Sequence, residues 1–231
     1  MHPIGYGIGF AARKAPGEAF VWDNKTNRYG YNLFRGHFIA KNKGIIKTLI
    51  IGDYAVGYGQ GLVLNSGFAI DKSCETIKIS RTGNLGIKPN NSLSNIAFRG
   101  VASTIAWSKM ETSFFYSIAK LDATLRENGK LGKRYVQSLK RNNYYRTKED
   151  LNKYGVIKEQ VIGGNITYKY SKSTEVGFNA LMHRYSLPIE PNTTRGNPYR
   201  FSGNKNSNYS VFFVKHGKIC IFLGKKAFLI I

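Results

Sequence analysis

Apolar and polar residues alternate with a period of two along much of the chain. The clearest segments are 4–11, 111–119, 163–170 and 176–183. In each of them an apolar, often aromatic residue stands at nearly every second position, and small or polar residues dominate the positions between. This pattern is typical of β-strands with one apolar face, because successive side chains of a strand point to opposite sides.

The alternating segments and the breaks between them predict a series of strands. They span residues 4–12, 28–41, 44–64, 95–107, 110–121, 160–170, 174–185, 207–215 and 218–228. Glycine, tyrosine and phenylalanine are abundant and proline is scarce, which suits strands and tight turns better than helices. Membrane-spanning helices are not expected, because no apolar run reaches the ~18 residues that such a helix needs.

The connections between these strands alternate between short and long. Short turns are expected at Asn42-Lys43-Gly44, Ser108-Lys109, Ser171-Lys172-Ser173 and His216-Gly217-Lys218. Long connections are expected near 13–27, 65–94, 122–159 and 186–206. Turns that are short at one end and long at the other are typical of outer-membrane barrels, whereas a soluble sandwich is not expected to keep this alternation. The predicted fold is all-β: an antiparallel up-and-down meander forming part of a transmembrane β-barrel, with long basic loops on one side.

The same alternation indicates that residues 1–231 form a single, partial barrel domain. The strand at 4–12 has no short-turn partner in the chain, so we expect its partner to precede Met1. No secretory signal stands at the N-terminus, although an exported barrel needs one. The final residues, 228–231, do not end on the aromatic residue usual for barrels, which is compatible with truncation there too. Upstream barrel strands are therefore expected partners.

A few polar residues lie in or beside apolar strand-like segments. They are Asp53, Gln60, Arg81 and Arg99. A charged side chain that faces lipid at mid-depth costs ~2–4 kcal/mol, so in a barrel these residues should point into the lumen and pair there. We expect Asp53 to pair with Arg99, and we expect a structural lumen network rather than a selectivity site.

The formal net charge of +22 predicts attraction to polyanions, which include nucleic acid, anionic lipid and phosphorylated glycolipid. Basic residues are dense in the 122–159 connection, where they interleave with aromatic residues. The candidates for facing a polyanion are Arg134, Lys140, Arg141 and Arg146. At a barrel rim the partners would be outer-membrane lipid and lipopolysaccharide. The alternative is a soluble basic β-rich protein that binds nucleic acid through phosphate contacts and base stacking.

Within the 122–159 connection one short helix is expected. Thr147 resembles a helix N-cap, the first turn after it carries Glu149 and Asp150, and Gly155 is suited to stop the helix.

Catalytic and metal-binding patterns are not apparent in the sequence. The four histidines are scattered, and no Ser/His/Asp or paired-carboxylate pattern shows, so we expect no enzyme and no cofactor. Cys74 and Cys220 lack the spacing of a zinc finger or a disulfide framework. The GxGxG string at 57–61 lacks the remainder of a phosphate-binding loop, and we interpret it as a kinked or bulged strand.

One stretch of the chain resembles a known family. Residues 52–67, which contain Gly52-Asp53-Tyr54 and Gly59-Gln60-Gly61-Leu62, together with Phe98-Arg99-Gly100, resemble the barrel portion of Bacteroidetes outer-membrane proteins identified as helix-hairpin-helix domain-containing. The resemblance extends over residues 4–227 and implies a location in the bacterial outer membrane. The helix-hairpin-helix part is absent here, and the family implies no catalytic residue. The expected function is an outer-membrane barrel segment, with pore, uptake and scaffold roles left open.

Overall fold

The computed structural model describes residues 5–24, 28–59, 61, 63–64, 86–90, 97–129, 132–140, 145–171, 173–191, 200–216 and 221–230. Within this part of the chain, no helix has the length and hydrophobicity that crossing a bilayer requires.

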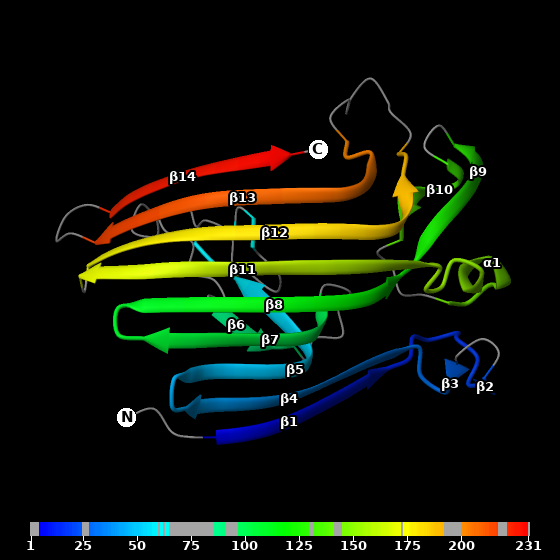
Figure 1. Ribbon diagram of the computed structural model, residues 1–231. Helices are drawn as coiled ribbons and strands as arrows, with labels where there is room; N and C mark the ends of the chain where they lie inside the picture. The colour runs from blue at the N-terminus through cyan, green and yellow to red at the C-terminus, as the bar shows by residue number, and fades with distance from the viewer. Residues whose placement is uncertain are drawn as a thin grey trace.

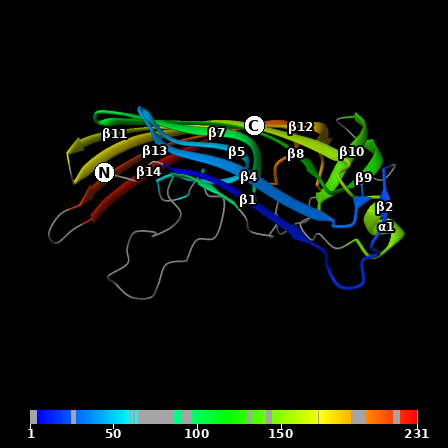
Figure 2. The ribbon, with the colours of Figure 1, turned by 90° about the horizontal axis from the view of Figure 1, so that it is seen from below.

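One large antiparallel sheet contains most of the described residues (Figure 1). Its long strands are β1 (Gly5–Arg13), β4 (Leu33–Lys43), β5 (Ile46–Gly57), β7 (Phe98–Trp107), β8 (Met110–Leu121), β11 (Ile157–Ser171), β12 (Thr174–Ile189), β13 (Gly203–His216) and β14 (Ile221–Ile230). They pair in this order, each with the next, so the predicted all-β antiparallel meander is confirmed. The sheet is arched, with a convex and a concave face (Figure 2).

Three of the four predicted short turns are described, and they lie at one end of the sheet, on the left in Figure 1. The residue pairs that close them are Lys43 and Ile46, Trp107 and Met110, and Ser171 and Thr174. The fourth turn, between β13 and β14, lies outside the described residues. At the first two turns the left-handed backbone falls on Asn42, Gly44 and Ser108, with φ of 55°, 59° and 53°. The predicted separation of short turns from long connections is therefore confirmed.

The 122–159 connection differs from the prediction, because it is not only a loop with one helix. It contains β9 (Ala123–Gly129) and β10 (Gly132–Leu139), which form a hairpin. Val136 of β10 bridges Ile189 of β12 in parallel, so the hairpin extends the long-connection end of the sheet. A small core of buried apolar residues holds it there: Ala123, Val136, Ile157 and Ile189. The density of basic residues obscured these few apolar positions in the sequence.

The predicted helix is present as α1 (Lys148–Leu151). Thr147 is its N-cap, and the Thr147 hydroxyl and the Asp150 carboxylate form a reciprocal capping box. Gly155, with φ of 57°, follows the helix in the left-handed conformation.

Two strand predictions were too long. The strand predicted at 28–41 begins at Leu33, because residues before it form a separate two-stranded hairpin of β2 (Trp22–Asp23) and β3 (Arg28–Tyr29). The strand predicted at 44–64 ends at Gly57. After it the chain turns, with the Gly61 amide donating to the Tyr58 carbonyl and positive φ at Gly59 and Gly61. The kinked strand expected at 57–61 is therefore a turn.

The main core lies on the concave face of the sheet. The end of β5, the described residues 58, 59, 61, 63 and 64 after it, and β6 (Gly86–Pro89), which pairs with β5, lie within the arch (Figure 2). Their apolar side chains pack against residues of β8, β11 and β12. The cluster includes Tyr54, Val56, Tyr58, Leu64, Ile87, Phe115, Val161 and Leu181. A side chain at Gly163 would place its Cβ 2.4 Å from the Phe115 ring, so glycine makes room for this packing.

Candidate functional site

The convex face carries a continuous apolar band. One row of directly opposed residues crosses the sheet from β1 to β12: Ile8, Phe38, Ile51, Val101, Tyr116, Ile162 and Met182. A neighbouring row contains Ile105, Ile166, Phe178 and Val211. Most of these side chains are exposed, as is Phe114 between the rows, at 57%. Exposed apolar area on this scale marks a surface that contacts a partner or a membrane.

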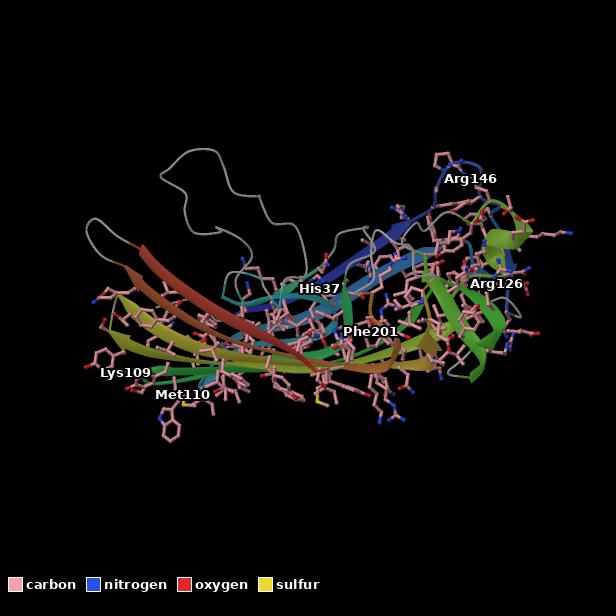
Figure 3. All side chains as sticks on the ribbon, turned by 90° about the horizontal axis from the view of Figure 1, so that it is seen from above. His37, Lys109, Met110, Arg126, Arg146 and Phe201 are labelled. Carbon is pink, nitrogen blue, oxygen red and sulfur yellow. The ribbon has the colours of Figure 1, made fainter. Side chains whose placement is uncertain are left out.

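Aromatic residues border the band at the short-turn end. Trp107 is 79% exposed, and Tyr168 and Tyr170 are exposed on the same face of β11. At the β1 edge the Lys43 ammonium lies 4.2 Å from the centre of the exposed Tyr6 ring. Figure 3 shows Met110 at this end on the outer side of the arch, and His37 within the curve. Tryptophan and tyrosine at such a border are typical of a membrane–water interface.

The opposite face carries small polar side chains that bond to one another across the strands. The Asn165 amide nitrogen donates to the Asn179 side-chain oxygen at 2.8 Å, and the Asn179 amide nitrogen donates to Ser210 Oγ at 3.0 Å. On neighbouring strands, the Thr104 and Ser113 hydroxyls are 2.8 Å apart. All of these residues are buried. The alternation correctly assigned these small polar residues to the face opposite the apolar band, but that face also carries the main apolar core around Tyr54 and Phe115, which the alternation did not predict.

Two further hydrogen bonds complete this polar network. The Thr167 hydroxyl donates to the Asn165 side-chain oxygen at 2.9 Å, and the Tyr58 hydroxyl donates to Ser113 Oγ. Tyr58 follows β5, so its hydroxyl ties the segment inside the arch to the sheet. A buried polar network with its bonds satisfied fixes a unique arrangement of the groups that form it.

Asp53 is the centre of a charged cluster where β4, β5 and β7 adjoin. Its side chain is 1% exposed. The Arg99 guanidinium donates to both carboxylate oxygens, at 2.9 and 3.0 Å, and Arg35 Nη1 donates to Oδ1 at 3.1 Å. The Gly36 amide donates to Oδ2 at 2.8 Å, and Arg99 also donates to the Phe34 carbonyl. The expected contact between Asp53 and Arg99 is present.

A glycine allows this cluster to form. Gly52 has φ of +111°, and a Cβ at this position would lie 2.2 Å from the Gly36 carbonyl oxygen. Only glycine permits that close approach, which brings the following carboxylate to the Gly36 amide. The sequence prediction missed Arg35, although the rule that singled out Asp53, a charge inside an apolar strand segment, applies to it equally. Gln60 and Arg81, the other two predicted members, lie outside the described residues.

The loop residues predicted to face a polyanion have different surroundings. Arg134 is exposed on β10, and Arg146 is exposed before α1. Figure 3 shows Arg146 at the end of the sheet opposite Lys109. Lys140 Nζ lies 2.5 Å from Asp150 Oδ1 and 5.7 Å from the centre of the Tyr145 ring. Arg141 lies outside the described residues. A polyanion-binding role for the four remains a prediction.

The sequence prediction did not identify a second carboxylate cluster at this end. Glu18 accepts from the Ala15 and Tyr145 amides, both at 2.8 Å. Asp122 accepts from the Tyr145 hydroxyl and, at 2.7 Å, from the Gly155 amide. Burial and the neighbouring Asp122 raise the pKa of Tyr145, which therefore stays a protonated donor. These bonds hold the connection after β1 against the segment before α1, so we assign the two carboxylates a structural role.

The Lys140–Asp150 pair leads to a titration prediction. The hydrogen bonds from Lys140 and Thr147 lower the pKa of Asp150 to about 2. In Lys140→Met the pKa of Asp150 should rise toward its ordinary value of 3.8, as measured by NMR titration of the carboxyl carbon. Lys148→Met, on the same helix, is the control and should leave the pKa of Asp150 unchanged. An unchanged value in Lys140→Met would mean that the Thr147 cap alone holds the pKa of Asp150 down.

No protein-family model, curated protein or solved structure matches this chain.

Proposed function

We propose that this chain forms part of the wall of a transmembrane β-barrel, with its convex face against lipid and its concave face toward the barrel interior. The observation that carries the proposal is the apolar row on the convex face, which no described residue covers. A water-soluble β-protein would be expected to bury such a row against a second layer. In a barrel wall the hydrocarbon of the bilayer takes that place.

The dimensions of the band support this function. On β11 this face runs from Tyr168, at the aromatic border, to the exposed Lys158, ten residues earlier, and its apolar positions end at Ile162, before the exposed Gln160. Ten residues of strand extend about 33 Å. With the usual strand tilt of about 40° the ten residues between the two borders correspond to a height of about 25 Å, the height of the apolar band of outer-membrane barrels, and the six residues from Ile162 to Tyr168 to about 15 Å.

The concave face suggests a role for this part of the wall. The described polar network is buried, and the apolar cluster around Tyr54 and Phe115 fills the face beside it. Side chains that already bond to and pack against one another are not free to contact solutes, which favours a scaffold role over a pore lining that selects solutes. The proposed location is the bacterial outer membrane, where barrels of this kind reside.

Depth-dependent fluorescence quenching tests the proposal. The chain contains two tryptophans, Trp22 and Trp107. We would refold the whole chain into phosphatidylcholine vesicles that carry bromine at defined depths. Phe114→Trp, made with both native tryptophans replaced by phenylalanine, should be quenched most strongly by bromine near the middle of the acyl chains. In Trp22→Phe, Trp107 is the single remaining tryptophan, and its fluorescence should be quenched more strongly by bromine near the headgroups than by bromine near the middle of the acyl chains.

Trp22 supplies the matched control. It lies on β2, away from the convex face, so Trp107→Phe should show little quenching by either lipid. If Phe114→Trp is no better quenched than Trp22, the convex face does not contact lipid and the barrel proposal is wrong. A soluble monomer that binds oligonucleotides with steep salt dependence would then favour the nucleic-acid alternative.

A further inference from the structure

Four basic residues form a row on the convex face at the long-connection end of the band. Lys120, Lys158, Arg184 and Lys205 lie on the neighbouring strands β8, β11, β12 and β13, and all four are exposed. Each lies on the same face of its strand as a residue of the apolar band, because the two residue numbers differ by an even number. The corresponding band residues are Ile118, Ile162, Met182 and Val211, in the same order. We call these four residues the basic row.

The pairing register places like charges opposite one another. Lys158 of β11 is the direct partner of Lys120 of β8, and Arg184 of β12 is the direct partner of Lys205 of β13. Directly opposed like charges destabilise a sheet. Among the described residues, no carboxylate forms an ion pair with any of the four. The arrangement therefore supplies concentrated positive charge that the described protein does not neutralise.

Three basic residues elsewhere on the sheet are paired with carboxylates. Arg99 binds the Asp53 carboxylate, and Lys47 and Lys169 share Glu111, at 2.9 and 3.3 Å. Carboxylates thus accompany these three basic side chains, whereas within the described part of the chain the row beside the apolar band lacks them, as do the single lysines Lys41 and Lys215. A partner that matches both surfaces must present anions at a fixed height next to hydrocarbon.

We propose that the basic row binds the phosphate groups of lipid headgroups in the leaflet at the long-connection end. This inference rests on the proposed function, because only a membrane around the band brings headgroups to that height. Phosphate oxygens accept charge-assisted hydrogen bonds from lysine and arginine, and one phosphate between two opposed cations relieves their repulsion. The row thereby sets the depth of the wall in the bilayer.

The test compares lipid-dependent stabilisation of the whole chain and its variants. The protein is refolded in dodecylmaltoside micelles, and its melting temperature is measured with added phosphatidylcholine or phosphatidic acid. A ligand that binds the folded state raises the melting temperature. Phosphatidic acid should raise that of the wild type above its value in phosphatidylcholine. The variant K120Q/K158Q/R184Q/K205Q should lose this gain, with an apparent affinity for phosphatidic acid at least about tenfold lower.

A second quadruple variant is the matched control. K109Q/R126Q/K148Q/K153Q removes the same numbers of lysines and arginines from a short turn, β9, α1 and the residues after it, and should keep the gain. In phosphatidylcholine alone the row variant should melt no lower than the wild type, because it removes two like-charge pairs. Loss of the gain in the control but not in the row variant would place the contact in the loops and overturn the proposal.

Further measurements distinguish lipid phosphate from free phosphate. They also distinguish a failure of the basic-row proposal from a failure of the barrel proposal. Inorganic phosphate at the same concentration should not reproduce the gain; an equal gain would overturn the assignment to lipid. A duplex oligonucleotide that displaces phosphatidic acid and binds more tightly than the lipid would overturn it as well. Strong quenching of Phe114→Trp by brominated lipid, combined with no gain from phosphatidic acid, would reject the basic row alone. Absent quenching would reject the barrel itself.

Discussion

Asp53→Ala should lower the free energy of unfolding by about 3–5 kcal/mol, because it leaves a buried arginine without its counter-charge. The Arg35 side chain is 8% exposed, and its contact with the Asp53 carboxylate is 3.1 Å. The same substitution removes the acceptor of the Gly36 amide and of Arg99. Urea unfolding of the refolded chain, followed by tryptophan fluorescence in detergent or vesicles, measures the loss.

Glu111→Ala is the control for this prediction. Glu111 also contacts two cations, Lys47 and Lys169, but both of these side chains are about half exposed. Water screens such pairs, so the loss should stay below about 1 kcal/mol. The double variant Asp53→Ala with Arg35→Met should recover part of the stability, because the unpaired charge is gone. Equal losses for Asp53→Ala and Glu111→Ala would show that the buried cluster contributes no more than a surface pair.

Ile166→Arg should lower the free energy of unfolding in lipid vesicles by about 2–4 kcal/mol, because it places a charge near the middle of the apolar band. Tyr170→Arg lies on the same face of β11 at the aromatic border, where the cost falls to about 0–1 kcal/mol. Reversible urea unfolding of both variants in the same vesicles gives the difference. In a soluble protein both are exposed surface substitutions, and each would change stability by less than about 0.5 kcal/mol. Equal small effects would therefore argue against lipid contact.

The faces of the sheet could be predicted because strand periodicity is a local property. The alternation over 163–170 and 176–183 assigned Ile166 and Phe178 to one face and Asn165 and Asn179 to the other, and the structure has the same assignment. The turn at Ser108-Lys109 and the Thr147 cap were also predictable, since each depends on a few adjacent residues. The strand predicted through residue 64 was too long because the alternation of apolar and polar residues gives no sign of the turn that Gly59 and Gly61 permit.

The members of each cluster could not be predicted in the same way. Asp53 and Arg99 were paired correctly as two charges inside neighbouring apolar segments. Arg35 and the Gly36 amide join them only because Gly52 lets β5 approach β4 closely. The β9–β10 hairpin joins the sheet through the bridge from Val136 to Ile189 and the small core around them, which bring together segments far apart in the chain. The basic row exists only through register, since a shift of one residue would move those four side chains to the other face.

The sequence by itself determined that this chain forms strands with one continuous apolar face and with small polar residues on the other, joined by short turns at one end. It could do so because side-chain direction and turn conformation follow from neighbouring residues. Only the tertiary structure decided which residues lie opposite one another, what fills the concave face, and that the apolar band of the described residues remains uncovered. Those features depend on pairing between distant segments, where the energy of a contact is set by register and burial rather than by adjacent sequence.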